Sequence, residues 1–308
     1  KLDRKVYMEM DITTAEGSQR ADLIKVEGDL GLSAPAIFTI VPAENDVQPG
    51  KFKLIEYTGE FIGTDNFTVR GLTGLSYEIV HEDKAIYLVI NAQRSAAQGV
   101  IWSGHTSSTW DYQTPNFLLG TDTTEFVAGD EVEFNDEAQS VLITLTDLMP
   151  IGKVTVNNNE KNISFTGDGG LSGSGSLIKE GSGRLSLVTT KSDYTGPTII
   201  NGGTVLVKEL ADGGLPSSIG AASSSPENLQ IGKATLNIDN ANTATDRGIT
   251  LTDTASIQVN SGTTSLKGQI KGDGMLAKKG AGQLNITYGG ANTWSGGTRL
   301  VAGTLAMG

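Results

Sequence analysis

The sequence predicts an all-β protein folded as a right-handed parallel β-helix, a β-solenoid of stacked rungs in one stack or in two stacked segments. Two observations predict this fold. Apolar residues recur in short sets spaced by two, which is the period of a strand with one buried face. A glycine-rich segment at 173–207 also recurs at 272–307. Repeated units that stack on one another bury a continuous core between them.

The repeat is visible when its two copies are aligned. At an offset of 99 residues, the first half of one copy falls on the first half of the other, and after one inserted residue the offset is 100. The motifs GSG at 181–183 and GAG at 280–282 fall where one strand is expected to end and the next to begin. Glycine adopts the positive φ that such corners require. We therefore expect Leu185 and Leu284 to be equivalent, inward and buried.

The alternating apolar sets mark short strands. Between them stand Gly, Asn, Asp, Ser and Thr, which accept turn conformations, and no segment keeps a helical i, i+3, i+4, i+7 pattern over the length of a helix. The sets in the second half of the chain are Val141/Ile143/Leu145, Val154/Val156, Ile163/Phe165, Leu185/Leu187, Leu236/Ile238, Ile249/Leu251, Ile257/Val259 and Leu284/Ile286.

Three regions are expected along the chain. Residues 1–91 carry apolar pairs of the same kind and are interpreted as terminal rungs of a preceding β-helix stack. The stretch NAQRSAAQG at 91–99 interrupts the alternation, so residues 92–120 are expected to form a junction with an aromatic cap. Residues 121–308 are expected to form a β-helix that contains both copies of the repeat. The pairs in the first region are Ile24/Val26, Leu30/Leu32, Phe38/Ile40, Phe52/Leu54, Phe67/Val69 and Ile86/Leu88/Ile90.

Composition limits the partners. The net charge of −12 argues against nucleic acid and anionic membranes, which both attract basic surfaces. The chain has no cysteine, which excludes disulfides and thiolate metal sites. No apolar run reaches the ~18 residues of a membrane helix, so no membrane insertion by this segment is expected. A monomer without cofactors is expected.

No catalytic or metal site is predicted. The acidic residues are scattered among expected turns, where Asp commonly bonds to nearby backbone. The two histidines, His81 and His105, lie far apart, whereas a zinc site needs three or four ligands. The acidic candidates considered are Asp130, Asp136, Asp193, Asp239, Asp246, Asp253 and Asp273.

The densest aromatic cluster consists of Trp102, Trp110, Tyr112 and Phe117. One interpretation is a platform on which sugar rings stack, and these four residues are the candidate binding residues. The other interpretation is a cap on the first rung that follows the junction, because the open end of a solenoid must be covered. The second interpretation is favoured.

The glycine-rich segments resemble the autotransporter-associated β-strand repeat, also called the passenger-associated transport repeat. Its pattern runs G-x-G-x-L-x-K-x-G-x-G-x-L-x-L, then Y-x-G-x-T-x-I-x-x-G-x-L. Gly173–Leu187 with Tyr194–Val205, and Gly272–Ile286 with Trp294–Leu305, follow it, with Trp294 and Arg299 as departures. The resemblance implies a β-helix that is secreted or displayed on the surface of a Gram-negative bacterium as part of a longer, outer-membrane-associated protein. It also implies that such repeats help a passenger to fold and reach the surface.

Two functions remain open from the sequence. One is a non-catalytic passenger or stalk segment that supports surface display or adhesion, with host or environmental glycans or surface proteins as partners. The other is a carbohydrate-binding or polysaccharide-degrading β-helix, similar to lyases or glycosidases. Aligned carboxylates and aromatics on one parallel sheet would favour the second function, and a smooth face of Thr, Asn and Lys would favour the first.

Overall fold

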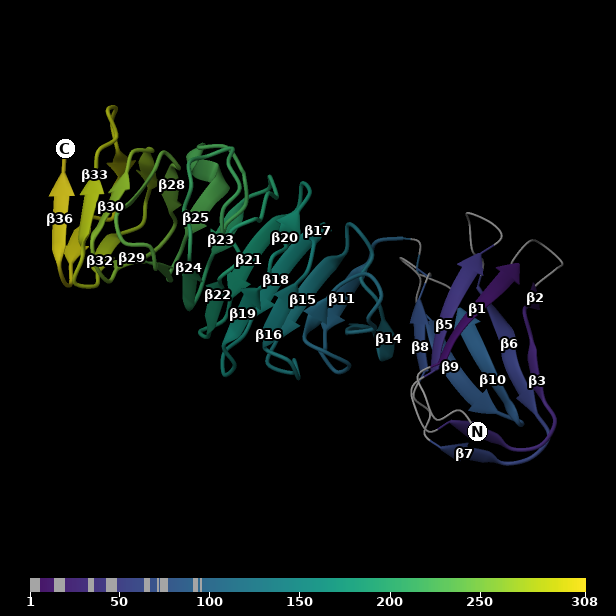
Figure 1. Cartoon of the computed structure of the whole chain (residues 1–308). Helices are drawn as coiled ribbons and strands as arrows, with labels where there is room; N and C mark the ends of the chain where they lie inside the picture. The colour runs from purple at the N-terminus through teal and green to yellow at the C-terminus, as the bar shows by residue number, and fades with distance from the viewer. Residues whose placement is uncertain are drawn as a thin grey trace. The chain divides into compact units, whose positions relative to one another are not determined.

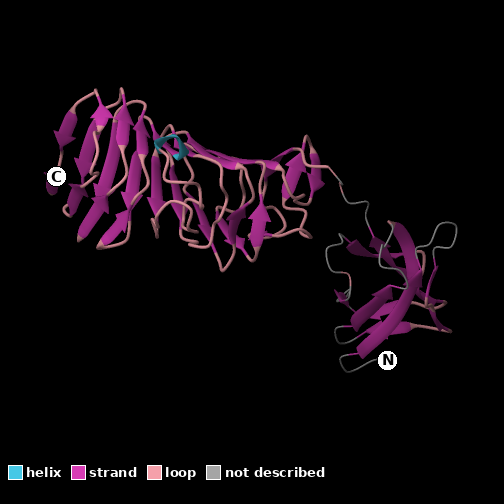
Figure 2. Cartoon of the chain, turned by 90° about the horizontal axis from the view of Figure 1, so that it is seen from above, coloured by secondary structure: helices cyan, strands magenta, loops and turns pink. Residues whose placement is uncertain are grey.

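The structure is a computed structural model that describes residues 6–13, 20–32, 36–42, 49–63, 67–70, 72, 77–90, 94 and 96–308 (Figure 1). The chain divides into two compact units, Lys1–Arg94 and Ser95–Gly308. The described residues are almost entirely strands, turns and loops. Their helical content is one 3-10 turn, η1 (Pro226–Asn228), drawn in cyan in Figure 2.

The first unit combines parallel and antiparallel strand pairs. Three of the first four strands each have a later strand parallel beside them: β5 on β1, β6 on β3 and β7 on β4, whereas β2 pairs antiparallel with β1. β8 adds to β5 in parallel, whereas β10 pairs antiparallel with both β6 and β9. The bounds are β1 (Val6–Thr13), β2 (Arg20–Ala21), β3 (Ile24–Val26), β4 (Leu30–Leu32), β5 (Ala36–Pro42), β6 (Gly50–Tyr57), β7 (Phe61–Gly63), β8 (Phe67–Arg70), β9 (Tyr77–Glu82) and β10 (Ala85–Ile90).

The antiparallel strands of this unit were not anticipated from its apolar pairs, because alternation reports which face is buried and not the direction of the neighbouring strand. The parallel pairs are those that stacked rungs make. The assignment of residues 1–91 to a preceding stack therefore stays a proposal. Of the break in alternation, residues 91–93 and 95 lie outside the described part of the chain.

The second unit is a parallel β-solenoid. One track is an eleven-stranded sheet and a second is a nine-stranded sheet, while a third face carries a two-stranded and a four-stranded sheet. The eleven-stranded sheet holds β14 (Asp122–Thr124), β13 (Phe117–Leu119), β11 (Gly99–Trp102), β15 (Glu131–Asn135), β18 (Lys153–Asn157), β21 (Ser176–Glu180), β23 (Thr198–Ile200), β25 (Leu229–Ile231), β28 (Ile249–Leu251), β31 (Ile270–Gly272) and β34 (Thr293–Trp294).

The other tracks complete each rung. The nine-stranded sheet holds β12 (Thr109–Trp110), β16 (Leu142–Leu145), β19 (Ile163–Thr166), β22 (Arg184–Leu187), β24 (Thr204–Val207), β26 (Thr235–Ile238), β29 (Ala255–Val259), β32 (Leu276–Lys279) and β35 (Thr298–Leu300). The third face holds β17 (Leu148–Pro150) and β20 (Gly170–Ser172), then β27 (Thr243–Thr245), β30 (Thr263–Leu266), β33 (Gln283–Ile286) and β36 (Thr304–Met307).

Successive rungs repeat in register. Strands of the eleven-stranded track begin at Glu131, Lys153, Ser176 and Thr198, a spacing of 22 or 23 residues. From β11 to β34 this track is parallel, and only the hairpin β13–β14 pairs antiparallel, on the free edge of β11. The predicted all-β solenoid is confirmed for this unit.

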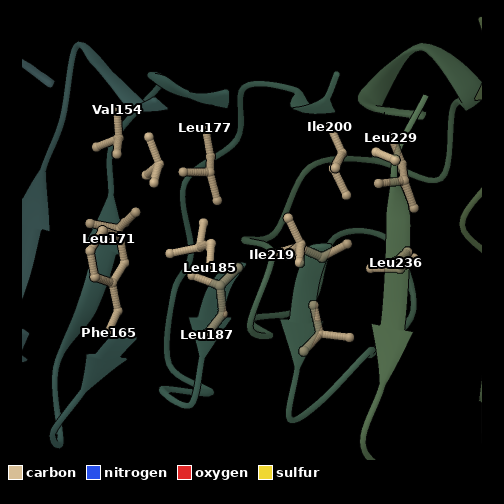
Figure 3. Packing of buried hydrophobic residues seen from close by; sticks show 14 of the residues in the cluster. Val154, Phe165, Leu171, Leu177, Leu185, Leu187, Ile200, Ile219, Leu229 and Leu236 are labelled. Atoms are coloured by element: carbon tan, nitrogen blue, oxygen red, sulfur yellow. The ribbon is translucent and has the colours of Figure 1, made fainter. Parts of the chain in front are cut away.

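The core is a set of apolar rows inside the stack. Val154 lies beside Leu177 in the next rung (Figure 3). Ile163 lies beside Leu185. Leu185 and Leu284 are both completely buried, as predicted from the alternation. Each inward residue is covered by its counterparts in the rungs before and after it, so a narrow stripe is enough to make a core.

The two copies of the repeat occupy different faces of the solenoid, which corrects the expectation that Leu185 and Leu284 are equivalent. Leu185 belongs to β22 of the nine-stranded sheet, whereas Leu284 belongs to β33 on the third face. The motif encodes a strand, a glycine corner and a second strand. The interior presents a similar apolar surface to every face, so the same corner can be used at different positions of the rung.

An insertion interrupts the regular spacing between β24 and β25. The side chain of Arg247 is buried beneath it and donates hydrogen bonds to five carbonyl oxygens, those of Ala211, Asp212, Leu215, Gly220 and Ala222, at 2.8–3.4 Å. A buried guanidinium needs several acceptors of this kind, because burial removes the water molecules that would otherwise accept hydrogen bonds from its N–H groups. The insertion is thus fixed on the solenoid and was not recognised from the sequence.

We predict that Leu185→Ala destabilises the chain by about 2–5 kcal/mol, because it removes a completely buried side chain and leaves a cavity. Ser186→Ala, one residue along on the outer face, is the control and should change stability little. Urea unfolding followed by circular dichroism measures both. Equal midpoints for Leu185→Ala and the parent would contradict the assigned inward register.

Candidate functional site

The aromatic residues singled out from the sequence lie together inside the second unit. The side chains of Trp102, Trp110 and Phe117 are completely buried, and Tyr112 packs against them from a half-buried position. The Trp102 and Phe117 ring centroids are 5.1 Å apart, and those of the two tryptophans 6.4 Å. Phe126 adds a further ring, 5.3 Å from Trp110. These rings form one continuous cluster at the first rungs.

This cluster occupies the beginning of the solenoid interior. Trp102 ends β11, Phe117 begins β13 of the antiparallel hairpin, and Trp110 ends β12. The Trp102 indole N–H donates to the Ser140 carbonyl at 2.9 Å. A sugar-stacking platform needs an accessible ring face, and the three buried rings offer none.

Each copy of the repeat places a lysine inside the solenoid. Lys179 lies in the inward row between Val156 and Ile200, and Lys278 lies between Ile257 and Leu300 in another sheet. Both side chains are buried. The sequence analysis treated these lysines only as part of the motif. The alternation could have shown their direction, since Lys179 is two residues from the inward Leu177.

The inward lysines bind the carbonyl groups of the glycine corners. The Lys278 ammonium donates to the carbonyls of Lys279 and Gly280 at 2.8 Å and to that of Ala302, in the next rung, at 3.2 Å. Lys179 donates to the Gly181 carbonyl at 3.1 Å and to that of Glu180. An ammonium group has three N–H donors and can satisfy several carbonyls that a sharp corner turns inward. The lysine of the motif therefore stabilises its corner from within.

Burial lowers the pKa of Lys179 to about 8, although the negative charges of Glu180 and Asp136 oppose this shift. Burial also lowers the pKa of Lys278. The direction follows from the loss of water around the charged form.

A second pair of polar contacts is shared by both copies. The Tyr194 hydroxyl is hydrogen-bonded to the Thr198 hydroxyl at 2.6 Å, and the Trp294 indole N–H donates to the Thr298 hydroxyl at 3.2 Å. Tyr194 is completely buried, and this burial raises its pKa. The replacement of tyrosine by tryptophan in the second copy keeps a hydrogen bond to the threonine hydroxyl four residues later.

Three of the acidic candidates have structural partners in turns, whereas one carboxylate oxygen of Asp193 is buried without a hydrogen-bond partner. Asp136 accepts hydrogen bonds from the backbone N–H groups of residues 159–161, which lower its pKa. Asp130 is buried and accepts from the N–H groups of Gln98 and Val127, both at 2.8 Å. Asp246 accepts from the Gly213 N–H at 2.7 Å. The carboxylates of these three residues hold the backbone of neighbouring loops, as the turn interpretation predicts.

The remaining candidates are distributed along the solenoid. Asp239 forms an ion pair with Lys208 at 3.7 Å, and Asp273 accepts a hydrogen bond from the Ser295 hydroxyl at 3.2 Å. His81 belongs to the first unit, where its ring contacts the Tyr57 hydroxyl at 2.6 Å, and His105 belongs to the second. Within the described residues, no three His, Asp or Glu side chains are grouped as metal ligands. No helix in that part of the chain is long and apolar enough to cross a membrane.

The lowered pKa of Lys179 predicts a pH dependence. Between about pH 8 and its ordinary value near 10.5, the unfolded chain binds a proton at this residue that the folded chain has lost, so stability rises with pH in this window. From pH 7.5 to 10, the stability of the parent relative to Lys179→Met should increase by roughly 2 kcal/mol. Urea unfolding at both pH values measures it, with the exposed Lys233→Met as control. A pH-independent difference between parent and Lys179→Met would show that Lys179 titrates normally.

Comparison with known proteins agrees with the geometry of the repeat. The Passenger-associated-transport-repeat family matches residues 177–207 and 276–307. These ranges contain both glycine corners and both inward lysines. An autotransporter adhesin of Brucella suis biovar 1 (strain 1330), Adhesin BmaC autotransporter, is 38% identical over 176 residues. That match covers 54% of this chain and 5% of the relative, so the chain spans a small part of the relative's length. No solved structure matches the chain.

The repeat and the relative lead to one identification. Two matched repeat copies coincide with strand–corner–strand units of a parallel solenoid, and the matched relative is an autotransporter protein. The chain therefore contains two copies of the passenger-associated transport repeat and is similar to a segment of an autotransporter adhesin.

Proposed function

We propose that this chain is a non-catalytic passenger segment that forms a stalk and contributes to adhesion at the bacterial surface. The observation that carries this proposal is the structural role of the carboxylates along the solenoid. Those with assigned contacts hold turns or make cross-strand pairs. A general acid at neutral pH needs a raised pKa instead.

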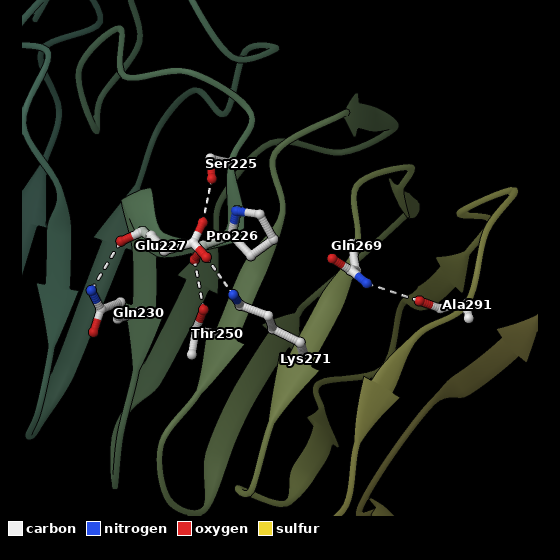
Figure 4. A network of polar contacts seen from close by, with 8 residues as sticks. All are labelled: Ser225, Pro226, Glu227, Gln230, Thr250, Gln269, Lys271 and Ala291. Carbon is white, nitrogen blue, oxygen red and sulfur yellow. Dashed lines mark hydrogen bonds and ion pairs between the residues drawn. The ribbon is translucent and has the colours of Figure 1, made fainter.

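Two carboxylates on the outer face of the eleven-stranded sheet illustrate this structural role. Glu227, in the η1 turn that precedes β25, forms an ion pair with Lys271 of β31 and accepts a hydrogen bond from the Ser225 hydroxyl (Figure 4). These contacts lower the pKa of Glu227 to about 2. Glu131 is likewise paired with Lys153 of the next rung. Carboxylates held in this way are suited to the stability of the stack rather than to proton transfer.

The adhesive part of the proposal draws on two further observations. From β22 to β29, most outward positions of the nine-stranded sheet are Ser, Thr, Asn or Gln, the polar surface expected for a stalk that makes surface contacts. The matched relative is named as an adhesin. Glycans or proteins of other surfaces are the proposed partners, while the buried tryptophans are assigned to the solenoid end rather than to binding.

Adhesion of coated beads tests the proposal. Beads carrying the folded chain should attach to cultured host cells more than beads carrying the heat-unfolded chain. When the folded chain is incubated with pectin, alginate and glycosaminoglycans, with and without calcium, it should not cleave them, so no new polysaccharide chain ends should appear. Attachment equal to that of the unfolded control would contradict the adhesive role. Turnover that disappears when a single Asp is replaced would contradict the non-catalytic role.

The proposed cap at the first rungs predicts a stability effect. Replacing Trp102 and Trp110 together by Ser should lower the melting temperature and promote association. The change removes two completely buried rings beside a sheet end and exposes apolar surface. The control is the double variant Trp102→Phe, Trp110→Phe, which keeps an aromatic ring at both positions. Calorimetry and light scattering measure both effects. A double Ser variant that stays stable and monomeric but loses glycan binding would reverse the assignment.

A further inference from the structure

The nine-stranded sheet is free of acidic residues although the chain carries a net charge of −12. Its nine strands, all within the described part of the chain, contain no Asp or Glu. In the neighbouring eleven-stranded sheet, the strands contain Asp122, Glu131, Glu133 and Glu180. Charge is therefore segregated between two faces of the same solenoid.

One outward row of this sheet carries an arginine in β22 and another in β35. Strand pairing places Arg184, Thr204, Thr235, Ser256, Ala277 and Arg299 side by side across six successive strands. Both arginine side chains are exposed. Five strand spacings separate them, which is roughly 24 Å along the solenoid. The residues between them are small, and the side chains of Thr235, Ser256 and Ala277 are buried, so the exposed or partly exposed groups of the row are Thr204 and the two arginines.

A lysine supplies a third positive charge near the middle of this row. Lys279, at the end of β32, extends back across two strands, and its ammonium donates to the Thr235 hydroxyl at 3.3 Å. This contact holds the ammonium over the part of the row between Arg184 and Arg299. The three cations thus follow one line across the strands, and we refer to Arg184, Lys279 and Arg299 as the basic row.

The margins of the sheet do carry carboxylates. Asp253 and Asp273 lie in the corners that precede β29 and β32, and Asp239 follows β26. Each has a partner: the Thr254 N–H at 2.5 Å, the Ser295 hydroxyl at 3.2 Å and Lys208 at 3.7 Å, respectively. These carboxylates define the edges of the acid-free strip and are not part of it.

We propose that the basic row binds a linear acidic polysaccharide that lies across the strands, parallel to the solenoid axis. Guanidinium groups bind sulfate or carboxylate through paired N–H donors, and a lysine ammonium binds them as a point charge. The partly exposed hydroxyl of Thr204 and amide of Gln258 are suited to sugar hydroxyls. Polysaccharide is favoured over single-stranded nucleic acid, because the six strands of the row contain no aromatic residue on which a base could stack. The inference rests on the proposed adhesive function and specifies its partner.

Immobilised heparin and polygalacturonate are the probes, with neutral dextran as the uncharged comparison. The triple variant Arg184→Gln, Lys279→Gln, Arg299→Gln should bind the acidic polymers at least about tenfold more weakly than the parent, because three ion pairs are lost. The matched control is Lys153→Gln, Lys191→Gln, Lys271→Gln, which makes the same change of net charge elsewhere on the unit and should bind within about twofold of the parent. Circular dichroism and melting confirm that both variants are folded.

Further outcomes separate this inference from the proposed function. Binding of the parent should fall as salt rises, because the contacts are ionic. Fragments much shorter than roughly 24 Å should bind weakly, because they cannot span the row. Equal binding by the triple variant and its control, or tighter binding to duplex DNA than to heparin, would overturn the inference. If the folded chain attaches beads to cells but binds neither acidic polymer, the adhesive function stands and the polysaccharide inference is wrong.

Discussion

The close stacking of backbone on backbone at the glycine corners is the constraint on which the rest of the solenoid depends. Gly203 has a φ of +63°, and a Cβ atom at this position would lie 2.1 Å from the Gly183 carbonyl oxygen of the previous rung. Gly181 has a φ of +67°, and its Cβ would lie 2.3 Å from the Asn158 carbonyl oxygen. A side chain at either place would force successive rungs apart. Because glycine has no side chain, the corners of successive rungs can lie in contact, and neighbouring strands pair without a break in register.

This register decides which chemistry is inside and which is outside. Leu185 and Lys179 are buried because both fall on inward positions, and the lysine is tolerated there because corner carbonyls accept its N–H groups. The same register brings Arg184 and Arg299 into one outward row, although they are far apart in the sequence. A solenoid of this kind can therefore change its outer surface residue by residue while its corners and core stay constant.

Much of the fold could be predicted from the sequence, because the strand period and the glycine corners are local signals. The buried Leu185 and the turn role of Asp136 follow from such signals. The face on which each copy lies could not be predicted, because the insertion after β24 and the different rung lengths shift the strands between faces. The basic row was hidden for the same reason: it exists only when the pairing of β22 to β35 is known. The hydrogen bonds from Arg247 to backbone carbonyl groups also join residues that only the fold brings together.

The most direct test of the account compares two glycine substitutions in the second unit. Gly203→Ala introduces a side chain at a positive φ against the previous rung, whereas a Cβ at Gly99 would meet no atom within 4 Å. The free energy of unfolding in urea should fall by about 2 kcal/mol or more for Gly203→Ala and change little for Gly99→Ala. Equal stability of the two variants would contradict the claim that closely stacked corners set the architecture.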